Sequence, residues 1–340
     1  MRGFTPDFAS RAGVMRDLRK RMDPKPYTGD DMNTRQDIYT RITTEIVAAI
    51  EAGTGQWRMP WHHDGSSITR PTNVASGKEY RGVNTLALWI AAHMRGFRSG
   101  LWGTYRQWNA LGAQVRKGEH ATSIVFWKRI GEPDDRETDA GDAEDRVRFV
   151  ARGYAVFNRS QVDGYEPEEQ PALPESERIV RADAFLAALN IPVTFGSDAA
   201  YYRIDLDRIF MPSFAAFHEA TGYVATYAHE AAHATGAKHR LNRDLGTRFG
   251  REALAMEEIV AELTAALVTA TLSIAHHPRA DHAAYVASWL KVLKNDDRAI
   301  FTAASKAQAA ADWMHSQQPS RNEHSASTVP RGERAEELIV

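Results

Sequence analysis

The segment His229-Glu230-Ala231-Ala232-His233 constrains this chain more than any other feature, because it lies inside a helical pattern of apolar residues. Residues four apart share one face of a helix, so both imidazoles can reach one metal ion while Glu230 projects beside it. Neutral imidazole is a good zinc ligand, and a site with few protein ligands leaves a position for water. The pattern therefore predicts a zinc site with Glu230 as the general base of a peptidase-like centre.

A third protein ligand is needed, and the following residues offer two candidates. His239 completes the spacing HExxHxxGxxH, in which the last histidine binds the metal after a glycine turn. The alternative is Glu258 in the segment MEEIVAEL, where Glu258 and Glu262 share one helix face. The class with a third histidine also needs a methionine-bearing turn, whereas Met256 lies within a helical pattern, so Glu258 is favoured. Glu262 would then orient one of the histidines from behind.

Composition limits the remaining possibilities. The 340 residues include no cysteine, which excludes disulfides and thiolate metal sites and leaves histidine and carboxylate as ligands. The 43% hydrophobic and 25% charged residues are typical of a globular protein with room for two domains. The sequence has neither a long apolar run nor an N-terminal signal region, so we expect a cytoplasmic protein without a membrane segment.

Positive charge and aromatic residues are concentrated in the first half of the chain. Residues 33–130 hold 13 Lys and Arg against 6 Asp and Glu, a local excess of +7, together with six of the eight tryptophans. Cations neutralise phosphates and aromatic faces stack on unpaired bases, so this combination indicates single-stranded nucleic acid as a partner. Segment 132–145 then holds eight acids and one base, which predicts a solvated loop between two strands.

The candidate DNA-binding residues are aromatic and basic side chains of that half: Tyr80, Arg81, Trp102, Tyr105, Arg106, Arg116 and Lys117. Arg116 and Lys117 precede a glycine, which is typical of a turn that presents two cations. We expect Trp57, Trp61 and Trp108 to lie in the core instead, because buried tryptophan fills space in a small domain.

Periodicity and turn residues divide the chain into five expected segments: a flexible leader (1–32), a first domain (33–165), a linker with three prolines and five glutamates (166–178), a second domain (179–315) and a disordered tail (316–340). The expected helices are 37–51, 84–94, 181–189, 217–235, 251–274 and 281–313, and the expected strands are 121–130, 147–157 and 200–212. These elements indicate an α+β protein whose second domain is mostly helical with a small sheet.

Longer segments carry a family resemblance. The segment ATYAHEAAHATGAKHRLNRDL followed by EEIVAEL resembles the C-terminal zincin-like metallopeptidase domain of ArdC-type antirestriction proteins. The first half resembles their single-stranded-DNA-binding domain, which also occurs in TraC-type conjugal primases. The matching residues are QWRMPW (56–61), Pro71–Asn73, YRGVN (80–84), WGTYRQWNALGAQVRKGE (102–119), VFNRSQVDG (156–164) and, in the second half, WLKVLKNDDRAIFTAASKAQAA (289–310). The resemblance covers about residues 33–315.

The resemblance implies a zinc ion held by His229, His233 and Glu258, the last being the glutamate of the E-x-x-A-E segment. It implies a small zincin fold with a sheet laid over the active-site helix. Members of the family are carried by mobile elements and phages and are linked to the protection of incoming DNA, so it also implies a bacterial cytoplasmic protein that can be transferred to a recipient cell. The acidic segment 132–145 departs from the family pattern as an insertion.

Three functions stay open on the sequence. The leading hypothesis is an antirestriction protein that binds single-stranded DNA and whose zinc metallopeptidase domain acts on an unknown protein substrate. The second is a DNA-coating protein with a structural or vestigial zinc site. The third is a protease that repairs DNA–protein crosslinks, which would use the same two halves.

Overall fold

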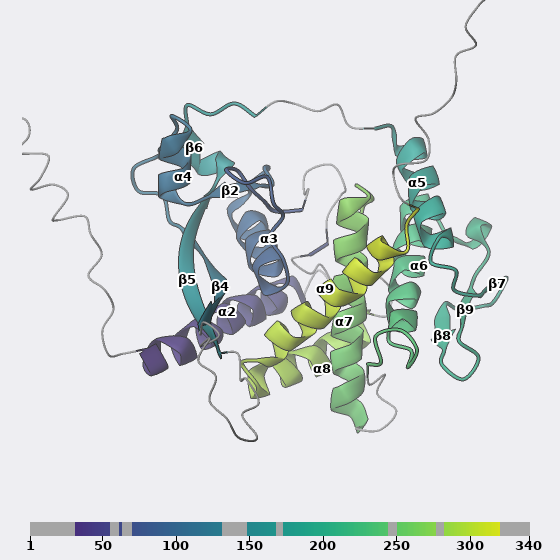
Figure 1. Cartoon of the computed structure of the whole chain (residues 1–340). Helices are drawn as coiled ribbons and strands as arrows, with labels where there is room; N and C mark the ends of the chain where they lie inside the picture. The colour runs from purple at the N-terminus through teal and green to yellow at the C-terminus, as the bar shows by residue number, and fades with distance from the viewer. Residues whose placement is uncertain are drawn as a thin grey trace, which may run out of the picture.

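A computed structural model describes residues 31–54, 61–62, 70–130, 148–167, 173–243, 250–276 and 282–319. Figure 1 shows these residues as a region of sheet and helix from the first half, packed beside a helical bundle with a small sheet from the second half. Most of the predicted leader, the acidic segment 132–145, Trp57 and nearly all of the predicted tail lie outside the described residues. Within the described residues, no helix is both long and apolar enough to cross a membrane.

The first half contains α2 (Asp31–Thr54), β1 (Thr72–Asn73), α3 (Val83–Arg95), β2 (Leu101–Gly103), α4 (Tyr105–Ala110), β3 (Gln114–Val115), β4 (Thr122–Ile130), β5 (Arg148–Asn158) and β6 (Val162–Asp163). Four of the strands form a sheet in the order β1-β2-β5-β4, and β3 pairs with β6. The long antiparallel hairpin of β4 and β5 is the pair of strands that the β-branched and aromatic segments predict.

The second half contains α5 (Glu175–Ala187), β7 (Val193–Phe195), β8 (Tyr201–Arg203), β9 (Arg208–Met211), α6 (Ala220–Thr235), α7 (Gly250–Thr271), α8 (His282–Asn295) and α9 (Ala299–Ser316). Its three-stranded sheet has the order β7-β9-β8, with β7 parallel and β8 antiparallel to the central strand. The predicted α+β class, with a mostly helical second half, is confirmed.

The predicted elements differ from the structure at several places, and three of the differences have a local cause. Helix α5 begins at Glu175, inside the predicted linker, because Pro174 precedes it and acidic residues in its first turn suit a helix N-terminus. The single predicted strand 200–212 is two strands joined by a turn, in which Asp207 adopts a left-handed φ of 45°. The predicted helix 281–313 is interrupted after Asn295, where Asp296 Oδ1 accepts a hydrogen bond of 2.8 Å from Arg298 N.

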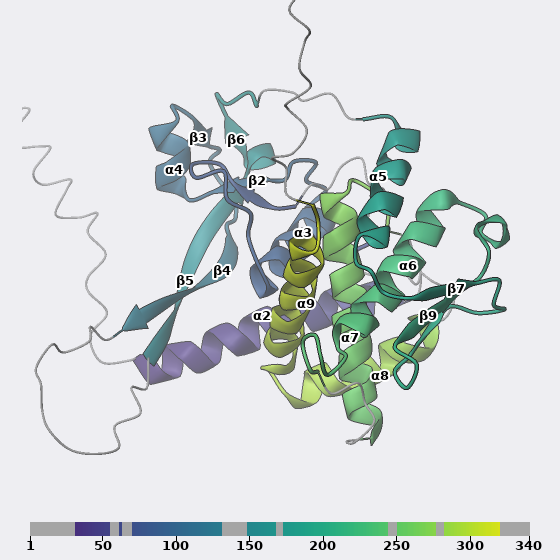
Figure 2. The same ribbon diagram turned by 45° about the vertical axis from the view of Figure 1, so that its right-hand side comes forward.

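Helix α2 joins the two halves into one core. Its buried residues Ile38, Ile42, Ile46 and Ile50 recur every four positions and belong to the same hydrophobic cluster as the interior of α6, α7, α8 and α9. Figures 1 and 2 both show α2 running from the end of the β4–β5 hairpin to the helices of the second half. At the hairpin, a Cβ on Gly153 would lie only 2.8 Å from Ile38 Cδ1, so glycine permits the close approach.

Helices α6 and α7 pack against each other through small side chains. Ala228, Ala231 and Ala232 of α6 and Ala261 and Ala265 of α7 are all fully buried. Small residues let two helix backbones approach closely, so longer side chains beside them are brought face to face. Two such side chains on α6 are the histidines of the sequence motif.

Candidate metal centre

The motif histidines and one glutamate of α7 point their ligand atoms at a common point. His229 Nε2 lies 3.1 Å from His233 Nε2, and each of these nitrogens lies 3.6 Å from an oxygen of Glu258. Ligand atoms around a tetrahedral ion with bonds of about 2.1 Å are roughly 3.4 Å apart. These three side chains form one of the groups in the described chain that could hold a metal ion, and the donor set fits a divalent metal such as zinc.

His239, the other candidate for third ligand, lies elsewhere. Its side chain is 62% exposed, and its Nε2 is 3.3 Å from Asp207 Oδ2. Arg240 donates to both oxygens of the same carboxylate, at 2.7 and 2.9 Å. The structure therefore brings Glu258, and not His239, together with the two histidines.

A carboxylate contacts the ring nitrogen of His233 that faces away from the candidate metal position. His233 Nδ1 is 3.4 Å from Glu257 Oε1. Arg243 holds Glu257 through two contacts, Nη2 to Oε1 at 2.7 Å and Nε to Oε2 at 3.1 Å. Carboxylates in this position fix the tautomer and orientation of a metal-binding histidine.

A second carboxylate stands behind His229. Glu262 Oε2 is 3.5 Å from His229 Nδ1, and the Glu262 side chain is fully buried. The sequence predicts this orienting role for Glu262. It does not predict the role of Glu257, although its position next to Glu258 in an apolar helix is a signal, and nothing in the sequence pattern points to Arg243.

Charges around the centre shift two pKa values. Burial alone would lower the pKa of His233, but the hydrogen bond with Glu257 and the charges of Glu230 and Glu258 outweigh it and raise that pKa. Burial alone would raise the pKa of Glu257, but the hydrogen bonds with His233 and Arg243 outweigh it and hold that pKa below its usual range. Glu230, the neighbour of His229 on α6, is 3% exposed, and its charge contributes to the raised pKa of His233.

The structure places the predicted DNA-binding residues in different surroundings. Trp102 is 1% exposed in a core cluster with Leu88 and Val156, which corrects its assignment, because a stacking platform must expose its ring. Tyr80 is half-buried and its hydroxyl accepts a hydrogen bond of 3.0 Å from Asn73. Arg81 is exposed but pairs with Asp312 of α9. The expectation that Trp61 and Trp108 are core residues is confirmed, with exposures of 1% and 0%.

The other four candidates lie on the surface near α4 and β3. Tyr105 is 48% exposed, and Arg106 and Lys117 are exposed as well. Arg116 is partly neutralised, because its guanidinium contacts Glu119 at 2.7 Å and Asp163 at 3.4 Å. Tyr105, Arg106 and Lys117 therefore stay candidates for DNA binding because they are exposed. Arg116 is a weaker candidate, because its charge is already paired with two carboxylates of the protein.

A group of exposed aromatic residues on the β4–β5 hairpin is absent from the candidates that the sequence predicts. Phe126 and Tyr154 are 59% and 43% exposed and contact each other edge to face, with ring centroids 6.2 Å apart. Exposed Arg152 lies directly opposite Phe126 in the strand register. The strand pattern was visible in the sequence, but which of its aromatic residues face solvent depends on how the hairpin packs on α2 and α3.

Two family models match the chain, one in each half. The model for the N-terminal domain of the antirestriction factor ArdC matches residues 36–157. The model for a zincin-like metallopeptidase matches residues 180–306.

Similar proteins agree with these matches. An uncharacterized protein of Sinorhizobium fredii, y4eC, is 57% identical over 84% of this chain and 94% of its own length. Two DNA primases TraC of Escherichia coli are 33% and 35% identical, and the matched part is only 20% and 27% of their lengths.

The crystal structures of antirestriction protein ArdC from plasmid R388 have the same fold. The metal-free structure is 39% identical, with a TM-score of 0.67, and the match covers 83% of this chain and 97% of that protein. The Mn(II)-bound structure matches with a TM-score of 0.65 at the same identity. The two matched domains, in the same order and over nearly the whole length of that protein, show that the chain belongs to the ArdC family of antirestriction proteins.

Proposed function

We propose that this antirestriction protein binds single-stranded DNA and hydrolyses peptide bonds in a protein substrate, and that it thereby protects incoming mobile-element DNA. The observation that carries the proposal is the convergence of His229, His233 and Glu258 on one point, with Glu230 on the same helix turn. A protein that only bound DNA would not need the buried carboxylate of Glu230 immediately beside the two histidines.

In this proposal His229, His233 and Glu258 hold the metal, and Glu230 handles the proton. A bound zinc ion supplies polarisation of the peptide carbonyl and a lowered pKa for water. The carboxylate of Glu230 takes the proton from the attacking water and delivers it to the departing amine. Glu257 and Glu262 keep the two imidazoles turned with Nε2 toward the metal position.

Zinc is the proposed metal because two imidazoles and one carboxylate suit it. The ArdC structure from plasmid R388 is Mn(II)-bound, so the two metals are the alternatives to compare. Purification without chelator, followed by elemental analysis, should give one zinc per chain. Manganese in place of zinc in protein from metal-replete cells would contradict the choice of zinc.

The peptidase role is tested by Glu230→Gln, which preserves shape and removes the base. We expect this variant to bind metal like the wild type and to lose protection of incoming DNA in recipient cells, since losing a general base lowers rates by roughly 10²–10⁴-fold. The matched control is Glu252→Gln in α7, where the carboxylate is 66% exposed. Full protection by Glu230→Gln would contradict a catalytic role.

Burial at the centre favours one second candidate, a binding protein with a structural metal site. His229 and Glu230 are each only 3% exposed, whereas catalytic metal sites keep one position open. His233 and Glu258 are more open, at 15% and 12% of their side chains. The Glu230→Gln experiment separates the two, because a structural site would protect DNA without the base.

For the DNA we propose two surfaces of the first half. One is the hairpin face with Phe126, Arg152 and Tyr154, where two exposed rings contact each other and a cation lies opposite one of them in the strand register. The other is the surface of α4 and β3 with Tyr105 and Lys117. Exposed aromatic faces next to cations suit unpaired bases and their phosphates.

A further inference from the structure

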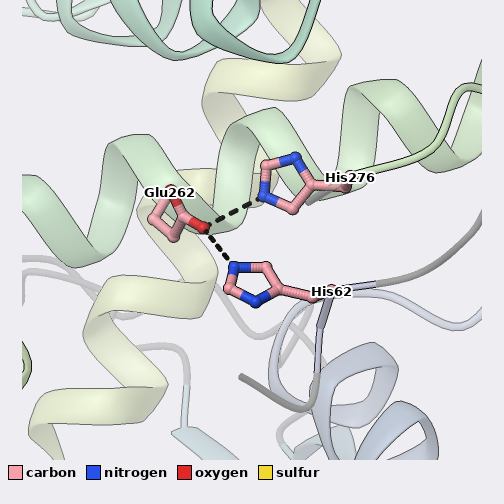
Figure 3. Close-up of side chains that lie close together, drawn as sticks. All are labelled: His62, Glu262 and His276. Atoms are coloured by element: carbon pink, nitrogen blue, oxygen red, sulfur yellow. Dashed lines mark hydrogen bonds and ion pairs between the residues drawn. The ribbon is translucent and has the colours of Figure 1, made fainter. Parts of the chain in front are cut away.

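A second group of metal-ligand side chains lies completely inside the protein. His62, Glu262 and His276 have exposures of 1%, 0% and 0%. Figure 3 shows both histidines pointing a ring nitrogen at the same oxygen of Glu262. Residue 276 follows α7, whereas residue 62 belongs to the first half of the chain, about 200 positions away from Glu262.

Three nitrogen atoms surround that oxygen. Glu262 Oε1 is 3.2 Å from His62 Nε2, 3.0 Å from His276 Nε2 and 3.2 Å from the indole Nε1 of Trp61. All three are hydrogen-bond distances, and a carboxylate oxygen accepts. Burying a carboxylate is costly unless donors surround it, so this arrangement stabilises Glu262 in one position.

The geometry favours hydrogen bonding over a second metal ion. The indole nitrogen of Trp61 only donates, so the Glu262 oxygen that both histidines face already accepts a hydrogen bond from a group that cannot bind a metal. Structural zinc sites use four protein ligands, whereas in the described part of the chain this group offers three. The three donors therefore serve to fix the carboxylate.

The other oxygen of Glu262 faces the candidate metal centre. Glu262 Oε2 lies 3.5 Å from Nδ1 of His229, and among the described residues this nitrogen makes no hydrogen bond of standard geometry. A movement of about 0.5 Å would bring the pair to hydrogen-bond distance. Contacts thus run from Trp61 and His62 through Glu262 to a histidine of the metal centre.

We propose that Trp61 and His62 are positioning residues of the metal centre, which hold Glu262 and through it the ring of His229. Both belong to the part of the chain that the N-terminal ArdC model matches. The first half therefore supplies two of the residues that hold Glu262 in the second half. This inference rests on the metal site proposed above, and it is independent of whether that site cleaves peptides.

The test compares metal affinity in full-length variants by competition with a chromophoric chelator, using zinc alone. Trp61→Phe removes the indole donor and keeps an aromatic ring, and His62→Phe does the same for the imidazole. We expect each to weaken zinc binding about 10–100-fold, the usual effect of losing an outer partner of a metal ligand. His62→Gln keeps an N–H donor and should recover most of the affinity.

The matched control is Trp108→Phe. Trp108 is also fully buried, and its indole donates a hydrogen bond of 3.0 Å to Phe157 O, in a different core cluster. The Trp108→Phe variant should bind zinc like the wild type. The absorption spectrum of the cobalt-substituted protein gives a second readout, because a tilted His229 changes the ligand field, whereas general loosening of the core does not.

Each outcome decides a separate point. Wild-type zinc affinity and cobalt spectra in Trp61→Phe and His62→Phe would overturn this inference and leave the metal site standing. A wild-type chain that binds no zinc would overturn the metal site and this inference with it. Two zinc ions per chain, falling to one in His276→Ala, would make the buried group a metal site and overturn its positioning role.

Discussion

Each histidine of the metal centre contacts a different carboxylate of α7, and different parts of the chain hold these two carboxylates. Glu257 contacts His233 and is held by Arg243, and both of these residues belong to the zincin-like half. Behind His229 stands Glu262, held partly by Trp61 and His62 from the first half. One side of the centre is therefore supported within the second half, and the other depends on the presence and position of the first half.

This difference agrees with the way the halves share their interior. The core cluster that contains α6 and α7 also includes Ile42 and Ile46 of α2 and Trp89 of α3. Polar contacts cross as well: Gln308 Oε1 of α9 accepts from Gly82 N at 3.1 Å and from Arg70 Nη2 at 3.3 Å. The two family domains are thus separate in sequence and joined in packing.

The largest effect should come from the ligands that both sides support. His229→Ala or His233→Ala should abolish stoichiometric metal, and Glu258→Ala should remove most of it, as measured by elemental analysis after gel filtration. His239→Ala should retain the metal, because that side chain lies on Asp207. Stoichiometric zinc in Glu258→Ala would show that the third ligand is another residue.

The next effect separates the two supporting carboxylates. Glu257→Gln leaves the guanidinium of Arg243, 5% exposed, without its anion, and breaking a buried pair costs about 3–5 kcal/mol of the free energy of unfolding. The Trp and His side chains around Glu262 carry no permanent charge, so Glu262→Gln should cost only about 1–3 kcal/mol. Urea unfolding of the metal-stripped variants measures both. Equal losses would mean that the two sides are supported alike.

A smaller effect concerns the proposed DNA-binding role of the first half. Replacing Phe126 and Tyr154 with Ala in the full chain should weaken binding to single-stranded DNA by about 1–3 kcal/mol per stacked base, while metal affinity stays unchanged. Phe195→Ala in β7, at 55% exposure, is the matched control. Fluorescence anisotropy with labelled oligonucleotides measures the difference. Unchanged DNA affinity would exclude the hairpin face as the stacking surface.

The surface of α4 and β3 can be examined in the same assay through the salt dependence of binding. Removing a phosphate contact lowers the slope of log affinity against log salt by roughly 0.7 for single strands. Lys117→Ala should therefore lower the slope more than Arg116→Ala, because Glu119 and Asp163 already pair with Arg116. The reverse order would mean that Arg116 leaves these acids for the DNA.

The smallest effect should follow from cutting the chain between its halves. A protease site placed at 168–172, within the predicted linker 166–178, should yield two pieces that still elute together, because α2 remains buried against α8 and the shared core holds. Zinc affinity should also stay as in the intact chain. Pieces that separate on gel filtration would contradict the shared core.

The sequence predicts the candidate metal ligands better than the residues that hold them in position, for a physical reason. His229 and His233 are four residues apart on one helix, and Glu258 and Glu262 repeat that spacing on another, so local periodicity suffices to find them. His62 and His276 reach Glu262 only through tertiary packing. No periodicity within one segment carries that information.

The predicted DNA-binding residues show the same limit. Trp102 and Tyr105 are three positions apart in one aromatic and basic stretch, yet the first is 1% and the second 48% exposed. Composition locates the half of the chain that suits nucleic acid, whereas exposure depends on the packing of the sheet. In the sequence, Phe126 and Tyr154 cannot be distinguished from buried strand residues, because their exposure also depends on this packing.

An anomalous difference map of zinc-loaded crystals, measured at the zinc absorption edge, would locate the metal in the protein. We expect one peak per chain, within bonding distance of His229 Nε2, His233 Nε2 and a Glu258 oxygen, with Glu262 hydrogen-bonded to His229 Nδ1. A peak between His62 and His276, or a peak bonded to His239, would contradict this expectation.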